Sequence, residues 1–140
     1  MTETSEVMDQ YLHALRDGSD FSRLFAPDVV WTTMETGERV EGRDAVRDHI
    51  AALHTQLFDA HPQLVRLLTG DGVAMLEAVF IGRQIAAWGD VPATGREVRM
   101  PYAMTYDVAG GLITALYAYF PVTALHAQLT RSELSGSAPH

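Results

Sequence analysis

Residues 96–108 read Arg-Glu-Val-Arg-Met-Pro-Tyr-Ala-Met-Thr-Tyr-Asp-Val, with an apolar side chain at every second position from 98 to 108. A period of two is typical of a β-strand that turns one face to the interior. Methionine adapts its shape and tyrosine carries a polar tip, so this face suits the wall of a ligand pocket as well as the core of a sheet. Its central members are Val98, Met100, Tyr102, Met104 and Tyr106.

Three further stretches near this one also have strand character. Strands are predicted over residues 63–69, 73–84 and 112–120, where β-branched and other apolar residues recur. Glycine-rich segments at 70–72 and 110–111 lie between them and favour tight turns. The second half of the chain therefore predicts a run of hairpin-connected strands.

Helical patterns come earlier in the chain. The first helix is expected to begin near Ser5 and to end at Gly18. The clearest helix follows Gly42, because the apolar residues after it recur at spacings that place them on one face. Those residues are Val46, Ile50, Leu53 and Leu57. We also expect a short helix over 20–26, a β-rich stretch over 29–34 with a brief return strand, and a last helix over 122–131. This order predicts an α+β fold with helices packed on one face of an antiparallel sheet.

The composition excludes several kinds of catalysis. The chain of 140 residues contains no cysteine, no lysine and no asparagine, and all ten basic side chains are arginine. A lysine Schiff base, a pyridoxal-phosphate anchor, a cysteine nucleophile and a thiolate zinc site are therefore excluded. Proton transfer by carboxylate, imidazole or phenol groups remains open.

Length and charge narrow the class of protein. A content of 47% hydrophobic and 20% charged residues is ordinary for a globular protein, so we expect one domain over 1–134 and a flexible tail over 135–140. The formal net charge of −8 argues against binding to nucleic acid or to a membrane surface. Because no stretch resembles a membrane span or a signal peptide, the chain is predicted to be cytoplasmic.

Glu77 is the only charged residue among the alternate positions from 73 to 81, which share one face of the predicted strand. It alternates with Val73, Met75, Val79 and Ile81. A lone carboxylate on an apolar face is suited to general acid/base catalysis, because desolvation disfavours its charged form and so raises its pKa. The alternative is that a bulge or an edge position returns Glu77 to water, or that it makes a structural hydrogen bond.

The histidines do not have the spacing of metal ligands. His49 and His54 are five residues apart, so they diverge on a helix, and no metal site is predicted. His49 lies one turn from apolar residues and is a candidate to flank a cavity, although a boundary histidine fits the pattern too. Trp31 and Trp88 are candidates for the core or for the rim of a pocket, and Trp88 lies in a glycine- and proline-punctuated stretch that is typical of a loop.

Taken together, these segments resemble the SnoaL-like polyketide cyclases of the nuclear-transport-factor-2-like superfamily and, more distantly, limonene-epoxide-hydrolase-like enzymes. The resemblance covers about residues 5–130. The segments that carry it are LFAPDVVW at 24–31, GRDAV at 42–46, PATGR at 92–96, YDV at 106–108, GGLI at 110–113, YF at 119–120 and QL at 128–129.

The resemblance implies a cone, in which a curved and mostly antiparallel sheet wraps around N-terminal helices and encloses one apolar cavity. It also implies a homodimer. By position in the family fold, the residues expected to line the cavity are Trp31, Thr33, Met75, Glu77, Met100, Tyr102, Met104, Leu116 and Phe120.

The chain departs from the family pattern at the end of the last strand. Family enzymes commonly carry an acidic residue there, whereas residues 118–121 read Ala-Tyr-Phe-Pro. The Gly-Thr-His seen in the middle strand of many relatives reads Gly-Arg-Gln at 82–84. The family's aspartate therefore cannot be carried over, and Glu77 is the internal acid that the sequence offers.

These observations predict a cofactor-independent cyclase or isomerase acting on an apolar, polyketide-type small molecule. Glu77 is the expected base, Tyr102 or Tyr106 the expected hydrogen-bond donor to the developing oxyanion, and His49 a further candidate. One alternative is the opening of an epoxide in the same cavity by water or by an internal hydroxyl. Another is a non-catalytic binding or accessory protein, which the missing last-strand acid favours.

Overall fold

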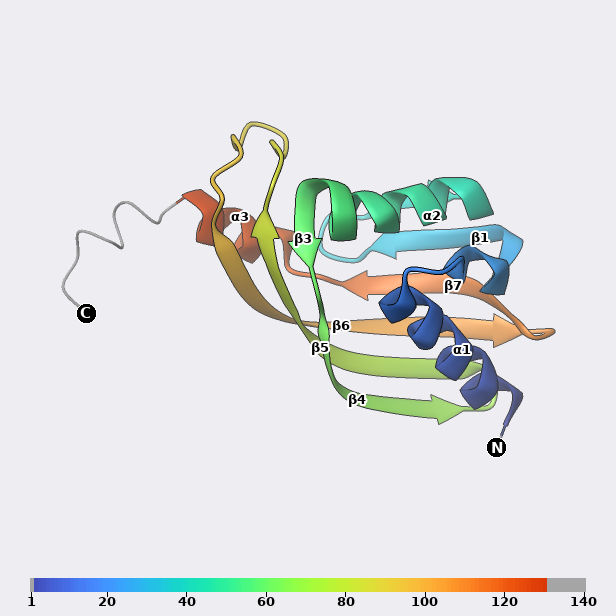
Figure 1. Ribbon diagram of the computed structural model, residues 1–140. Coiled ribbons are helices and arrows are strands. Elements are labelled where there is room, and N and C mark those ends of the chain that lie inside the picture. Colours follow the sequence, from blue (N-terminus) through green and yellow to red (C-terminus); the bar gives the residue numbers. More distant parts are fainter. Residues whose placement is uncertain (1, 131–140) are drawn as a thin grey trace.

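The computed structural model describes residues 2–130 and contains three α-helices, two short helical turns and seven strands (Figure 1). The tail predicted over 135–140 lies outside the described residues. In chain order the elements are α1 (Glu3–Asp17), η1 (Phe21–Leu24), β1 (Phe25–Thr33), β2 (Glu38–Glu41), α2 (Arg43–Ala51), η2 (Ala52–Leu57), β3 (Phe58–Ala60), β4 (Gln63–Gly70), β5 (Val73–Gln84), β6 (Glu97–Ala109), β7 (Leu112–Tyr119) and α3 (Val122–Thr130).

The strands form one curved sheet in the order β2-β1-β7-β6-β5-β3, and β4 pairs with the first half of β5. Every pairing is antiparallel except that of β1 with β7, which is parallel. Helices α1 and α2 lie on the same side of the sheet, and the long strands β5 and β6 bend around that side (Figure 1). The predicted α+β class and the curved, mostly antiparallel sheet are confirmed.

The ends of α1 follow ordinary capping chemistry, with one correction to the predicted boundary. Thr2 is the N-cap, because its side-chain oxygen accepts a hydrogen bond from the Ser5 backbone N–H. Ser5, the predicted cap, therefore lies inside the first turn. Gly18 ends the helix in the left-handed conformation with φ of 75°, as expected for a glycine after a last turn.

The helix after Gly42 changes its winding halfway. Residues 43–51 are α-helical, and residues 52–57 continue as a wider π-helical turn. The predicted common face is confirmed, because Val46 and Ile50 are buried while Leu53 and Leu57 pack against the same core. This element thereby extends one apolar wall from the core to the edge of the sheet.

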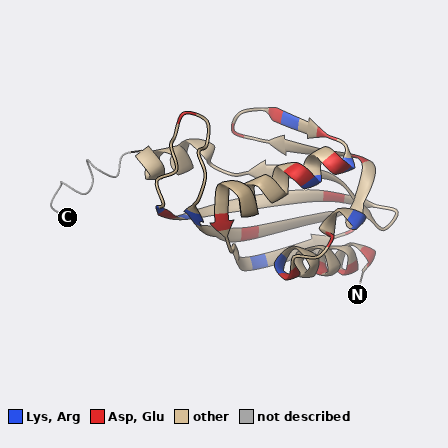
Figure 2. Cartoon of the chain, turned by 45° about the horizontal axis from the view of Figure 1, so that its top comes forward, with Lys and Arg blue, Asp and Glu red and all other residues tan. Residues whose placement is uncertain are grey.

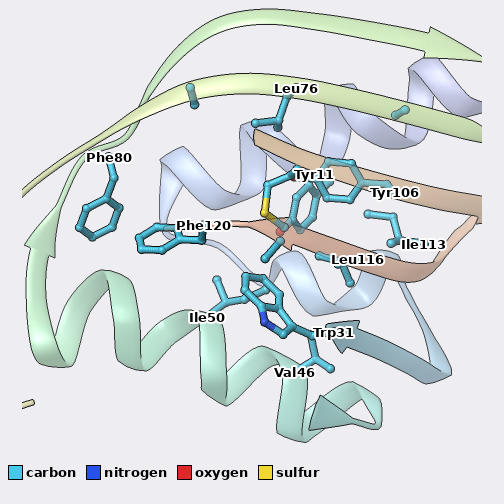
Figure 3. Close-up of a cluster of buried hydrophobic side chains, with 14 of the residues drawn as sticks. Tyr11, Trp31, Val46, Ile50, Leu76, Phe80, Tyr106, Ile113, Leu116 and Phe120 are labelled. Atoms are coloured by element: carbon cyan, nitrogen blue, oxygen red, sulfur yellow. The ribbon is translucent and has the colours of Figure 1, made fainter. Parts of the chain in front are cut away.

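The predicted inner face of residues 96–108 is also confirmed. On β6, Val98, Met100, Met104 and Tyr106 are buried and Tyr102 is half-buried. These side chains meet those of α1, α2, β1 and β7 in the interior, and part of this cluster is drawn in Figure 3.

The face predicted for β5 is wrong, because the opposite set of side chains points inward. The buried residues are Ala74, Leu76, Ala78 and Phe80, whereas Val73, Met75 and Glu77 are exposed. Both alternating sets are mainly apolar, so periodicity could not choose between them. Pairing with β6 decides the matter. Ala78 lies opposite Tyr102 and Leu76 opposite Met104, and directly opposed residues share a face.

Gly82 marks a close approach of two strands and provides a test of the packing. A methyl group at Gly82 would lie 3.1 Å from the Ala60 Cα and 3.1 Å from the Asp59 carbonyl oxygen on β3. We expect Gly82→Ala to lower the free energy of unfolding by about 1–3 kcal/mol, because backbone has to move. The measurement is urea denaturation. Gly70→Ala is the control, since its methyl would meet the more adaptable Val73 side chain, and an equal loss in both variants would contradict the argument.

Candidate functional site

A cavity of about 220 Å³ opens between β1, the α2–η2 helix, the loop after β5 and α3. Its wall is mostly apolar and aromatic, with a few polar groups, which is the usual character of a small-molecule site. The lining residues are Trp31, Thr33, Thr36, Glu38, His49, Ala52, Leu53, Leu57, Trp88, Phe120, Val122 and Leu125.

Trp31, Thr33 and His49 form the polar side of this cavity. The Trp31 Nε1–H donates a hydrogen bond of 2.9 Å to the Thr33 hydroxyl, so both buried groups are satisfied. The His49 ring lies 4.9 Å from the Trp31 ring in an edge-on arrangement. Trp31 therefore fixes one side of the imidazole.

The electrostatics favour an uncharged imidazole at neutral pH. Burial lowers the pKa of His49, and the Glu38 carboxylate acts in the opposite direction. A neutral imidazole has a lone pair that can accept a proton. Among the described residues, Glu38 is the only carboxylate that lines the cavity, and sequence reasoning missed it. Glu38 lies on β2, and Figure 2 shows that the hairpin of β1 and β2 carries several charged residues.

The buried amide of Gln84 holds the loop that carries Trp88. The Gln84 Oε1 accepts hydrogen bonds from the Thr94 backbone N–H at 3.0 Å and from its hydroxyl at 2.6 Å. The Gln84 Nε2 donates to the Ala86 carbonyl at 3.1 Å. Trp88 pairs with Val91 through two backbone hydrogen bonds, so the loop presents the indole ring to the cavity.

The tyrosines predicted as catalytic lie deeper in the molecule. Tyr102 is half-buried with its ring 5.2 Å from that of Phe120, a cavity residue. Burial raises the pKa of Tyr102 to about 12. Tyr106 is buried next to Tyr11 of α1, with ring centres 5.9 Å apart. Tyr11 is one of the buried residues of α1, together with Val7, Met8 and Ala14.

Glu77 does not face the cavity, and the expectation that it is an internal acid is wrong. Half of its side chain is exposed, and its Oε1 lies 2.9 Å from the Arg66 Nε on the outer side of the sheet. This is the alternative in which the carboxylate returns to water. Met75, on the same side of β5, is 49% exposed and is also wrongly placed by the prediction.

The other predicted binding residues divide into two groups. Trp31, Thr33, Trp88 and Phe120 line the cavity, as does His49. Met100, Met104 and Leu116 are buried in the core and are not among the lining residues. Figure 3 shows Leu116 and Phe120 on the inner side of the sheet, above Trp31 and Ile50.

Two further findings concern residues 2–130 only. In that range no group of three or more histidine, aspartate or glutamate side chains is close enough to hold a metal ion. None of the helices within it combines the length and apolar content needed to cross a bilayer.

Comparison with known proteins gives the same fold. A crystal structure of a candidate polyketide cyclase from Xanthomonas campestris pv. campestris has a TM-score of 0.80 and 20% identity, covering 91% of this chain and 97% of that one. A protein from Catenulispora acidiphila DSM 44928 with a ketosteroid-isomerase-like fold, in complex with trimethylamine, has a TM-score of 0.70 and 20% identity over 90% and 93% of the two chains.

A third structure, TerC co-crystallised with polyporic acid, has a TM-score of 0.71 and 13% identity over 91% of this chain and 98% of that one. No curated protein matches the sequence. The model of the SnoaL-like domain family, however, matches residues 8–116, which is most of the chain. The chain belongs to the SnoaL-like family and has the nuclear-transport-factor-2-like fold.

Proposed function

We propose that this protein is a cofactor-independent cyclase or isomerase acting on an apolar, oxygenated, polyketide-type molecule bound in the cavity. The observation that carries the proposal is the position of His49, a partly buried imidazole in the wall of a mostly apolar cavity. A desolvated base beside an apolar ligand is the arrangement that proton removal from carbon requires.

In the proposed reaction the neutral imidazole of His49 removes a proton from a carbon next to a carbonyl group. The electron pair of the C–H bond moves to the carbonyl oxygen, which becomes an enolate. In an isomerisation the proton returns to another atom of the conjugated system. In a cyclisation the enolate carbon attacks a second carbonyl carbon, and the proton passes to the new alkoxide. Neither route changes the number of electrons, so neither needs a cofactor.

Two sets of residues support this proposal besides His49. Tyr102 is the half-buried phenol beside Phe120, and a hydrogen bond from it stabilises an enolate oxygen. The aromatic wall formed by Trp31, Trp88 and Phe120 suits a planar ligand. TerC, which shares the fold, was crystallised with polyporic acid, and this supports an aromatic, oxygenated ligand class for the present cavity.

Hydrogen exchange into a ketone tests the proposal without knowledge of the natural substrate. The probe is 2-tetralone, a bicyclic ketone whose acidic C–H groups exchange in D₂O and are followed by proton NMR. Because the chain has no lysine, no side-chain imine contributes to the exchange. We expect exchange faster than with an equal concentration of free imidazole. Binding of 2-tetralone without faster exchange would overturn the enzymatic proposal and favour a binding protein.

We also propose that two copies of the chain pair through the outer side of the sheet. Helices α1 and α2 both lie on the opposite, inner side (Figure 1). Its exposed apolar residues include Leu68 on β4, Val73 and Met75 on β5, and Tyr119 on β7, with exposures of 47–61%. Apolar groups gathered on one face are typical of a protein interface.

Substitution of Met75 tests this pairing. We expect Met75→Asp to convert a dimer into a monomer in size-exclusion chromatography with light scattering, because a charge at the centre of an apolar interface is desolvated without a partner. Ile85→Asp is the matched control, since Ile85 is 48% exposed but lies past the end of β5. A monomeric wild-type chain, or a Met75→Asp dimer as stable as the control, would contradict the pairing.

A further inference from the structure

Three tyrosines from two elements have their side chains on the inner side of the sheet. Tyr106 of β6 and Tyr11 of α1 lie with ring centres 5.9 Å apart, and each is only 2% exposed. Figure 3 shows their rings next to one another within the core. Tyr102 shares the inner face of β6 with Tyr106 and contacts Phe120, whose ring centre is 5.2 Å away.

The hydroxyl groups of these tyrosines have no partner within residues 2–130. In that range Tyr117 is the only tyrosine whose hydroxyl makes a hydrogen bond to the protein. Every side-chain nitrogen or oxygen there that is sealed from solvent does have a partner. It follows that the hydroxyl oxygens of Tyr11 and Tyr106, which have no partner, each keep some solvent-accessible surface although both side chains are buried.

All three groups remain hydrogen-bond donors at neutral pH. Burial, followed by the presence of the neighbouring phenols, raises the pKa of Tyr106 and the pKa of Tyr11. Three protonated phenols without a protein acceptor form a site that an oxygen atom with lone pairs can fill.

The surroundings select against a charged ligand. No charged side chain within residues 2–130 is buried, so none can neutralise an ionic ligand in the interior. The buried polar residues there are Thr4, Ser22, Thr33 and Gln84. An isolated carboxylate or ammonium group would lose its hydration without compensation. A neutral carbonyl oxygen loses less and gains hydrogen bonds from the phenols.

We propose that Tyr11, Tyr102 and Tyr106 form an inner polar subsite that binds the carbonyl oxygen of a neutral ketone, at the deep end of the ligand cavity. Phe120 connects the two regions, because it lines the cavity and contacts Tyr102. The choice of ligand class rests on the proposed function. Tyr11 is thereby assigned a binding role in addition to its packing role.

A pair of matched probes tests the subsite through binding alone. 2-Tetralone carries a carbonyl group, and tetralin is the corresponding hydrocarbon. Binding is followed by the fluorescence of Trp31 and Trp88, which line the cavity. We expect Tyr11→Phe, Tyr102→Phe and Tyr106→Phe each to weaken 2-tetralone binding about 5- to 10-fold, the value of one hydrogen bond, and to leave tetralin binding unchanged.

The infrared carbonyl band of bound 2-tetralone gives a second readout. Hydrogen bonds to the phenols lower its frequency, and each Phe variant is expected to reverse part of that shift. Tyr119→Phe is the control, because Tyr119 is 50% exposed. If one variant fails to fold by circular dichroism, the other two still decide the matter.

The subsite and the proposed reaction can fail separately. Unchanged 2-tetralone affinity and an unchanged carbonyl frequency in the folded variants would overturn the subsite, even if wild-type protein accelerates hydrogen exchange. Conversely, selective loss of ketone binding in a protein that does not accelerate exchange would retain the subsite and remove the catalytic proposal.

Discussion

His49→Gln is expected to lower the rate of 2-tetralone hydrogen exchange by about 100-fold or more. Among residues 2–130, His49 is the only histidine that lines the cavity, and loss of a general base typically costs two to four orders of magnitude in rate. Glutamine keeps a polar group of similar reach beside Trp31 but does not accept a proton at neutral pH. We therefore expect 2-tetralone binding to change little. The measurements are NMR exchange rates and a fluorescence titration.

The pH dependence provides a control for the same residue. The base form of His49 is lost when the ring is protonated, so the exchange rate should fall as pH decreases through its pKa. Because burial lowers the pKa of His49, that fall should lie below the ordinary histidine value of about 6.5. Glu38→Gln removes a carboxylate that raises the pKa of His49, and should move the fall to still lower pH. His13→Gln, on the exposed side of α1, should leave rate and profile unchanged. An undiminished rate in His49→Gln would exclude His49 as the base.

The sequence predicted the strands more reliably than their orientation. On β6 the two alternating sets differ sharply, since Met100 and Tyr102 alternate with Arg99 and Ala103, and the inner face was predicted correctly. On β5 both sets are apolar, and the choice depended on the pairing with β6. Glu77 was therefore assigned to the wrong face of β5, because a shift of one residue exchanges the two faces of a strand. Only the pairing register with β6 shows which face points inward.

The site combines residues whose role depends on contacts between distant segments. Trp31 and His49 were recognised as candidates because each stands out in its own local pattern. Tyr11 did not stand out, because it lies in the apolar stripe of α1 and becomes a partner of Tyr106 only after α1 packs on the sheet. Gln84 and Glu38 lack any local signal. A buried amide that satisfies a loop is identified by its hydrogen bonds, which sequence spacing does not contain.

Phe80→Ala is expected to lower the free energy of unfolding by about 3–5 kcal/mol, the largest effect on stability among the changes considered. The Phe80 ring is fully buried on the inner face of β5. It contacts Phe58 of β3 at 5.4 Å and Phe120 at 5.3 Å between ring centres, both edge-on. Truncation removes apolar contact from three elements and leaves a void that the curved sheet cannot easily close. Urea denaturation monitored by circular dichroism measures the loss.

Two companion substitutions separate packing from other causes. Phe80→Leu keeps most of the volume and should cost roughly 1–1.5 kcal/mol. Ile85→Ala removes a comparable side chain that is 48% exposed, and should cost about 0.5 kcal/mol or less. Because Phe80 supports Phe120, Phe80→Ala should also weaken tetralin binding in the cavity, whereas Ile85→Ala should not. Equal losses of stability in Phe80→Ala and Ile85→Ala would mean that the cluster of Phe58, Phe80 and Phe120 does not hold the inner wall of the cavity.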